Sequence, residues 1–133
     1  MPQTIQQSVT LPAAANRLFE MYLDPRLHAA FTGAPVTINE KPGSEFTAFD
    51  EMITGRMLYT VPGHMIVQTW RSSEWHPEDI DSVLVLTFWP VGDAGRIELV
   101  HVNVADHDVE AVTQGWEKYY WKPWRSYLQE GAN

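Results

Sequence analysis

The stretch that decides the fold is Asp108–Leu128, DVEAVTQGWEKYYWKPWRSYL, which has the pattern of one long amphipathic helix. On a helical wheel, a single arc collects most of its apolar side chains; they are Val109, Val112, Trp116, Tyr119, Tyr120, Pro123 and Tyr127. Trp121 and Trp124 fall beside this arc. A helix of about 20 residues is roughly 30 Å long, the diameter of a small domain. We therefore expect the remainder of the chain to pack along this helix.

Two residues disturb the regular helix. Pro123 has no backbone N–H and crowds the preceding turn, so we expect a kink near residues 119–122. Gly115 weakens a helix by about 1 kcal/mol relative to alanine, unless close packing requires the missing side chain. The large rings of this stretch either fill the core or line a ligand pocket, and the sequence leaves both readings open.

Composition and charge limit the classes of protein to which the chain can belong. With 133 residues, 44% of them hydrophobic, we expect one domain over residues 1–133. The absence of cysteine excludes disulfides, thiolate metal sites and a cysteine nucleophile. The net charge of −8 argues against binding to nucleic acid or to an anionic membrane surface. The N-terminus lacks a signal-peptide pattern and no apolar run reaches membrane-spanning length, so we expect a cytoplasmic protein.

The chain before the long helix predicts a strand, two short helices and a series of antiparallel strands. A strand over residues 4–10 precedes a helix over 12–23, and Asp24-Pro25 supplies the N-cap and first turn of a second helix that ends at Gly33. Strands follow at 36–38, 45–49, 53–61, 64–71, 82–90 and 96–104. Pro62-Gly63 and residues 92–95 are tight turns, and Gly55 marks a bulge or a close approach. Segregated helices and strands indicate an α+β fold with helices on one face of the sheet.

Alternation along the later strands assigns the residues of each face. In the strand over 82–90 one face carries Leu84, Leu86 and Phe88. In the strand over 96–104 one face carries Ile97, Leu99, His101 and Asn103. In the strand over 64–71 and its end, one face carries Ile66, Gln68, Trp70 and Ser72. If these faces are concave, the polar side chains among them enter an otherwise apolar interior under the helix. Apolar walls with a few polar groups are typical of a small-molecule cavity.

The histidines give no metal motif. His64, His76, His101 and His107 have no metal-ligand spacing, so we expect no metal and no other cofactor. The acidic loop over residues 74–81 has the composition of a solvated surface rather than of a cation site. His101 is the titratable group to watch, either as an acid or base or as a buried histidine that bonds to Gln68 or Tyr119.

Several segments, spread over nearly the whole chain, carry a resemblance to a known family. They are residues 23–25 (LDP) with 28–35 (HAAFTGAP), 53–56 (ITGR), 61–63 (VPG), 66–73 (IVQTWRSS) and 115–123 (GWEKYYWKP). With these segments the chain resembles the SRPBCC superfamily of START and Bet v 1-like helix-grip proteins. Within it the chain is similar to the AHSA-type group, named for the activator of heat-shock protein 90 ATPase. The resemblance implies a curved antiparallel sheet of about six or seven strands around the long C-terminal helix, with a cavity between them and no catalytic motif.

We expect this cavity to bind a small hydrophobic, amphipathic or aromatic molecule. The expected ligand-binding residues are Gln68, Trp70, Leu84, Leu86, Phe88, Leu99, His101, Val112, Trp116, Tyr119 and Tyr120. Two alternatives stay open: a polyketide-type aromatase, cyclase or hydrolase that uses His101, and a chaperone partner that activates heat-shock protein 90 ATPase in the stress response. We expect a monomer or a weak homodimer, and exposed Trp75, Trp89 or Trp121 either form an interface or simply lie on the surface.

Overall fold

The computed structural model describes residues 1–131 and consists of one antiparallel sheet with helices packed against it. The domain expected over 1–133 includes residues 132 and 133, which lie outside the described residues. Seven strands follow the order β1-β7-β6-β5-β4-β3-β2. Their bounds are β1 Gln3–Leu11, β2 Val36–Thr37, β3 Glu45–Ala48, β4 Ile53–Val61, β5 Met65–Ser72, β6 Ser82–Val91 and β7 Ala94–Val104. This confirms the expected α+β helix-grip architecture.

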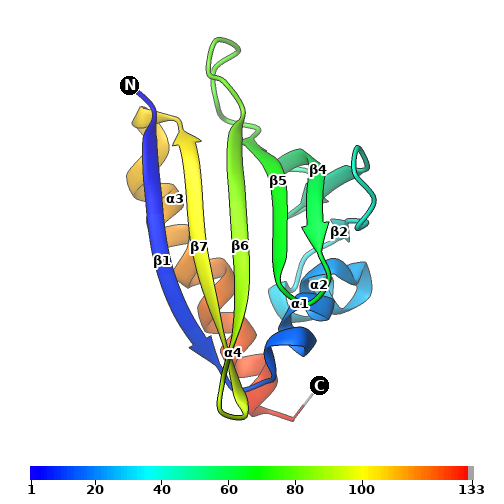
Figure 1. Ribbon diagram of the computed structural model, residues 1–133. Helices are drawn as coiled ribbons and strands as arrows, with labels where there is room; N and C mark the ends of the chain where they lie inside the picture. The colour runs from blue at the N-terminus through cyan, green and yellow to red at the C-terminus, as the bar shows by residue number, and fades with distance from the viewer. Residues whose placement is uncertain (132–133) are drawn as a thin grey trace.

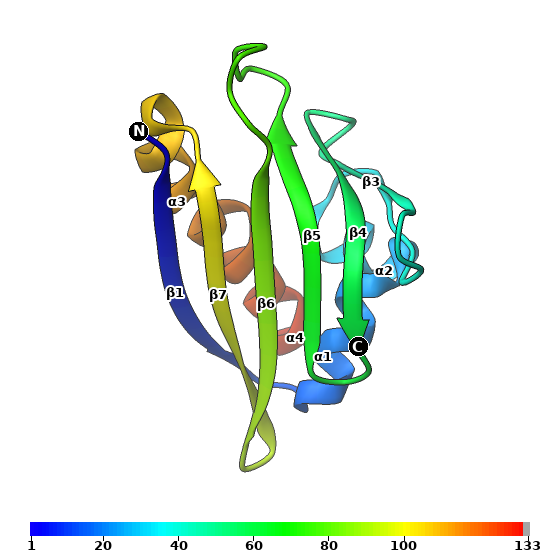
Figure 2. The same cartoon turned by 45° about the horizontal axis from the view of Figure 1, so that its top comes forward.

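The C-terminal helical segment crosses the sheet behind β1, β7 and β6 (Figure 1, Figure 2). It consists of the short turn η1 (Asp106–Asp108), α3 (Val109–Trp116), the π-helical segment η2 (Glu117–Trp121) and α4 (Lys122–Gln129). Gln7 of β1 holds both halves of this segment. Its amide donates to the Thr113 carbonyl at 2.9 Å, and its oxygen accepts from the Trp121 indole at 2.7 Å.

The π-helical segment corrects the helical wheel drawn from the sequence. The buried residues Val112, Trp116, Tyr120, Trp124 and Leu128 recur at every fourth position. In a regular α-helix four residues turn about 40° past a full turn, so this stripe would drift by about 160° over its length. The i→i+5 bonding of η2 takes up an additional residue and returns the stripe to the sheet. A kink was expected near residues 119–122, and the structure has the π-segment η2 just before Pro123 instead.

The buried face after η2 lies one residue further along the chain than the regular wheel predicts. The wheel placed Tyr119, Tyr120, Pro123 and Tyr127 inward, whereas Tyr120, Trp121, Trp124 and Leu128 are buried. Tyr119 is 48% exposed, and Pro123 and Tyr127 are partly buried. The expectation that Trp121 is exposed was therefore wrong, because the insertion turns its ring inward.

The two short helices begin and end where their sequence signals lie, with one exception. The carboxylate of Asp24 accepts from the backbone N–H groups of Arg26 and Leu27, which caps α2 (Pro25–Thr32). Gly33 ends α2 in the left-handed conformation with φ of 81°. The first helix, α1 (Ala15–Leu23), begins three residues after the predicted Pro12. It begins late because Ala13 N–H bonds to the Leu11 carbonyl at 2.8 Å, so the chain turns before helical bonding starts.

Gly55 provides a close approach between strands rather than a bulge. A Cβ at this position would lie 2.0 Å from the carbonyl oxygen of Thr69 on the neighbouring strand β5. The register shift between β4 and β5 falls elsewhere, between Met57 and Tyr59. The glycine is needed because no larger residue fits between these two backbones.

Two expectations about the ends of the strands and the loop need correction, those for Asn103 and Trp75, whereas Ser72 keeps its inward side. Asn103 is exposed rather than interior, because its φ of 62° and the irregular β1–β7 pairing turn its side chain outward. Ser72 is only half-buried at the end of β5. Trp75 is buried instead of exposed, since its ring packs on Trp70 with centroids 5.7 Å apart. Trp89 is the exposed tryptophan of the three that were expected, at 38%.

Candidate functional site

A cavity of about 400 Å³ opens between α3 with η2 on one side and the ends of β4 and β5 on the other. Its walls are mostly aromatic and aliphatic. The lining residues are Phe49, Met52, Ile53, Trp70, Ser72, Glu74, Asp108, Ala111, Val112, Gly115, Trp116, Tyr119 and Tyr120. This volume falls within the usual range of small-molecule sites.

The structure divides the residues that the sequence assigned to the ligand site into two groups. Those that line the cavity are Trp70, Val112, Trp116, Tyr119 and Tyr120. Those that lie in the core and outside the cavity lining are Gln68, Leu84, Leu86, Phe88, Leu99 and His101. Strand alternation identifies the inward face of a sheet, but it does not say where along that face the helix leaves space. The middle of the sheet is filled with side chains, and the space lies at one end.

Sequence reasoning missed the contribution of the loop between β3 and β4. Phe49, Asp50 and Glu51 all have positive φ, at 53°, 56° and 69°, so the chain makes a left-handed turn there. This turn brings Phe49 against Tyr119 and Tyr120, with ring centroids 5.7 and 5.8 Å apart. Consecutive left-handed non-glycine residues have no simple sequence signal. Gly115 did carry a signal, because a glycine within a helix is unfavourable unless the missing side chain has a use.

The aromatic walls of the cavity hold one another in place. Trp116 contacts Tyr120 at a centroid distance of 4.8 Å and Trp70 at 6.3 Å. Tilted and edge-to-face ring pairs at such distances are favourable beyond the area that they bury. The cavity therefore presents a preformed aromatic surface.

The polar groups at the cavity rim are acidic or neutral. Glu74 and Asp108 are the charged residues among the lining side chains of the described chain, and Ser72 adds a hydroxyl. Asp108 is fixed by the indole of Trp75, which donates to its Oδ2 at 2.8 Å. The Glu74 side chain is exposed at the mouth. An approaching ligand therefore meets apolar walls and a negatively charged rim.

His101 lies behind the wall of the cavity in a directed chain of hydrogen bonds. The indole of Trp116 donates to His101 Nδ1 at 3.2 Å, so the ring proton is on Nε2. His101 Nε2 then donates to the Ser82 hydroxyl at 2.8 Å, and that hydroxyl donates to the Trp70 carbonyl at 2.5 Å. Burial lowers the pKa of His101 to about 3, which keeps the ring neutral. Its partners are Ser82 and Trp116, not the expected Gln68 or Tyr119.

A second buried network begins at His28, which the sequence analysis did not consider. His28 Nδ1 donates to the Tyr22 carbonyl at 2.8 Å, so its Nε2 accepts from the hydroxyl of Tyr120, also at 2.8 Å. The Tyr22 hydroxyl donates to Gln68 Oε1 at 2.7 Å. Burial lowers the pKa of His28 to about 4, against the opposing effect of its bond to Tyr22. This network fixes the ring of Tyr120 at the edge of the cavity.

These hydrogen bonds limit the chemistry available at the site. His101 uses both nitrogens within the core and does not line the cavity. The Ser82 hydroxyl gives its proton to a carbonyl, which is the opposite of what a nucleophile activated by histidine requires. Neither His101 nor Ser82 is therefore arranged to transfer a proton to a group in the cavity.

Comparison of the sequence with known proteins identifies a matching protein family. A family model described as Activator of Hsp90 ATPase homolog 1-like protein matches residues 12–129. The human activator of 90 kDa heat shock protein ATPase homolog 1 is 27% identical over 123 residues, which is 92% of this chain and 36% of the human protein. An uncharacterized protein of Schizosaccharomyces pombe is 29% identical over 128 residues, 96% of this chain and 38% of that protein. The chain thus spans less than two fifths of the length of these relatives.

Solved structures agree with this assignment at the level of the fold. An HSP90 activator from Plasmodium falciparum superposes with a TM-score of 0.85 at 19% identity, over 95% of this chain and 96% of that one. A protein from Chromobacterium violaceum superposes with a TM-score of 0.73 at 25% identity, over 94% and 96% of the two chains. Among the helices of residues 1–131, none has the length and apolar character needed to cross a membrane.

Proposed function

The chain belongs to the family of Activator of Hsp90 ATPase homolog 1-like proteins, and we propose that it binds a small hydrophobic or amphipathic molecule in the cavity beside α3. The observation that carries this proposal is the continuous aromatic wall of Phe49, Trp70, Trp116 and Tyr120. Rings held by their neighbours lose little further freedom when a ligand binds, which lowers the entropic cost of binding.

The rim of the cavity supports a preference for neutral or cationic ligands. Glu74 and Asp108 lie at the mouth, and among the residues that the structure describes no lysine or arginine lines the cavity. A carboxylate or phosphate on the ligand would be repelled by both groups, whereas an amine or ammonium would be attracted to them and to the faces of the indole rings. We therefore propose an apolar or aromatic body with a neutral or positively charged polar end.

Catalysis by an aromatase, cyclase or hydrolase mechanism has weaker support. That alternative assigned the acid or base role to His101, which is bonded on both sides within the core. The carboxylates of Glu74 and Asp108 lie at the rim, and Asp108 accepts from an indole. Turnover would need a proton-transfer group in contact with the ligand.

Activation of a chaperone ATPase is the function that the names of the relatives suggest. Those relatives are more than twice as long as the matched region, since the chain spans 36% of the human protein. The alignment therefore does not by itself assign the activity of the full-length relatives to this chain. We do not favour it over ligand binding, for which the cavity is direct support.

Binding can be tested with N-phenyl-1-naphthylamine, a neutral aromatic probe whose fluorescence increases when it leaves water. We expect saturable binding to one site, and a loss of at least about tenfold in affinity, or about 1.4 kcal/mol, for Gly115→Leu. Gly115→Ala is the matched control, because its Cβ makes an ordinary 3.6 Å contact with Tyr119 and leaves the cavity open. Equal probe affinity in Gly115→Leu and Gly115→Ala, with both folded, would exclude the cavity as the site.

A further inference from the structure

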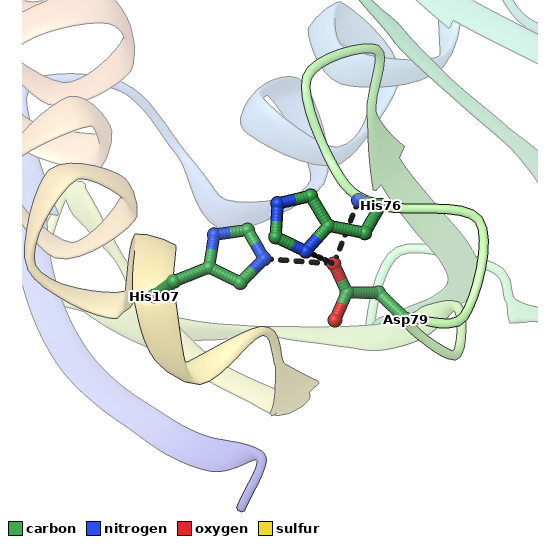
Figure 3. A group of neighbouring side chains, drawn as sticks. All are labelled: His76, Asp79 and His107. Carbon is green, nitrogen blue, oxygen red and sulfur yellow. Dashed lines mark hydrogen bonds and ion pairs between the residues drawn. The ribbon is translucent and has the colours of Figure 1, made fainter.

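His76, Asp79 and His107 form a compact group on the surface, away from the aromatic wall. Figure 3 shows the two imidazole rings and the carboxylate side by side, with ring nitrogens directed at one carboxylate oxygen. One ligand atom from each residue lies within 4.8 Å of the others. His107 Nε2 is 2.7 Å and His76 Nδ1 is 4.0 Å from Asp79 Oδ2. We propose that these three side chains bind a divalent transition-metal ion, with Zn²⁺ as the reference ion.

The donor set favours a metal of this class. Two imidazole nitrogens with one carboxylate oxygen suit zinc, nickel or copper, whereas magnesium and calcium prefer oxygen ligands alone. The metal would take the place of the hydrogen that His107 shares with Asp79, with the His107 proton carried by Nδ1 instead. Glu78 lies near enough to assist, since its Oε2 is 3.9 Å from His76 Nδ1. The remaining positions are open to water because both histidines are exposed.

The loop that carries His76 and Asp79 is held in shape before any ion binds. Arg71 of β5 donates to the carbonyl of Asp79 at 2.6 Å and to the carbonyl of His76 at 2.5 Å. Its guanidinium also pairs with Asp81 at 3.1 Å. Within the loop, His76 N–H donates to Asp79 Oδ2 at 2.8 Å. Metal-ligating side chains that are already held in position lose less conformational entropy when the ion binds. The fixed loop therefore favours metal binding.

The position of His107 is fixed from the opposite direction. It lies in η1 between β7 and α3, and its neighbour Asp108 accepts the indole hydrogen of Trp75, which precedes His76. The ring of His107 is held against the loop by its hydrogen bond to Asp79 Oδ2 at 2.7 Å. The three ligands are thus held on two separate elements, the loop after β5 and the turn η1.

This arrangement joins the two sides of the cavity rim. The end of β5 contributes Ser72 to the cavity, the loop after it contributes Glu74, and the start of the C-terminal helical segment contributes Asp108. A metal held by His76, Asp79 and His107 would tether these elements to each other only a few residues from the rim. Its ligands themselves are not in the cavity lining, so the metal site and the ligand site are separate and can be tested independently.

The test is isothermal titration of Zn²⁺ into the untagged, metal-stripped chain. We expect one equivalent to bind, with affinity reduced at least about tenfold in His107→Gln and in Asp79→Asn, and unchanged in the control His64→Gln. His64 is a suitable control because it lies near Phe88 in another part of the molecule. Each variant should remain folded in chelator, which its melting curve checks, although loss of the bond between His107 and Asp79 can lower the melting temperature slightly.

Two outcomes would overturn the proposal. One is the absence of zinc binding by the wild-type chain. The other is equal binding of Mg²⁺ and Zn²⁺ together with undiminished affinity in His107→Gln, which would indicate nonspecific attraction to the acidic loop. A chain that binds zinc but fails to bind the naphthylamine probe would support the metal site and reject the ligand site.

Discussion

The indole Nε1 of Trp116 donates a hydrogen bond to Nδ1 of His101 across 3.2 Å, and this contact connects the cavity wall to the core of the sheet. It determines which nitrogen of His101 carries the proton, and through Ser82 it reaches the backbone carbonyl of Trp70 on the other wall. The two tryptophans that face the cavity are therefore joined behind it by a continuous hydrogen-bond chain. A shift of the Trp116 ring would act directly on this buried network.

Replacing Trp116 with phenylalanine should destabilise the protein by about 1–3 kcal/mol. The substitution keeps a large ring but leaves His101 Nδ1 buried without its donor, and an unsatisfied buried acceptor costs about that much. The measurement is the free energy of unfolding in urea. Trp89→Phe is the control, since its indole bonds only to the Thr87 hydroxyl at an exposed position, and we expect it to change stability by less than about 0.5 kcal/mol. Equal losses in the two variants would contradict the role of the buried bond.

Stability should fall as the pH drops from about 6.5 to about 4. The pKa of His28 is lowered to about 4 and that of His101 to about 3, against an ordinary value of 6.5. In this window the unfolded chain binds more protons than the folded chain, so acid favours unfolding, whereas above the window both states are neutral at these residues. Each histidine contributes a slope of about 1.4 kcal/mol per pH unit.

The contribution of one histidine can be isolated by substitution. Urea unfolding of His28→Gln at several pH values should give a shallower slope than the wild type, although its stability at neutral pH is lower because the bond from Tyr120 is lost. An unchanged slope in His28→Gln would mean that His28 does not remain neutral in the folded protein.

Two glycines should respond to alanine in opposite directions. Gly55→Ala forces its Cβ to within 2.0 Å of the Thr69 carbonyl, so strands β4 and β5 must separate and stability should fall by at least about 1–3 kcal/mol. Gly115→Ala adds a methyl group at ordinary contact distance in α3 and should stabilise the protein by up to about 1 kcal/mol. Thermal melting of both variants provides the measurement, and a stable Gly55→Ala protein would disprove the close approach.

Deleting Lys118 should leave the protein folded with the same buried residues. Lys118 is exposed within η2, and the π-segment behaves as a single-residue insertion into an α-helix. Its removal would bring Tyr120, Trp121, Trp124 and Leu128 onto one α-helical stripe with Trp116. Deletion of Gln114 is the control, because in α3 it rotates Val112 away from the sheet by about 100°. If both deletions lower the melting temperature equally, the π-segment is not a separable insertion.

Short-range signals predicted the order and bounds of most elements. Asp24-Pro25 begins α2, Gly33 ends it, and Pro62-Gly63 makes the hairpin between β4 and β5. Each of these depends on backbone preferences of adjacent residues, which operate without any distant partner. The period of two along β4 to β7 likewise predicted the α+β class and the inward faces of the strands. The resemblance to a helix-grip family agrees with the family model over residues 12–129.

Only the tertiary structure decided which inward-facing residues line the cavity and which pack against other side chains in the core. Leu84 and Leu86 share the inward face of the sheet with Trp70, yet both are fully buried in the core, whereas Trp70 lines the cavity. The one-residue offset after Glu117 depends on which aromatic rings fit against the sheet, and a helical wheel contains no information about that fit.

The polar groupings depend on the fold in the same way. His28 and Tyr120 are separated by 92 residues, and Asp79 and His107 by 28. Spacing along the chain therefore gave no sign of either contact. Sequence alone determines local conformation because its causes are local, whereas a site is determined by packing, which brings together side chains that the chain itself keeps apart.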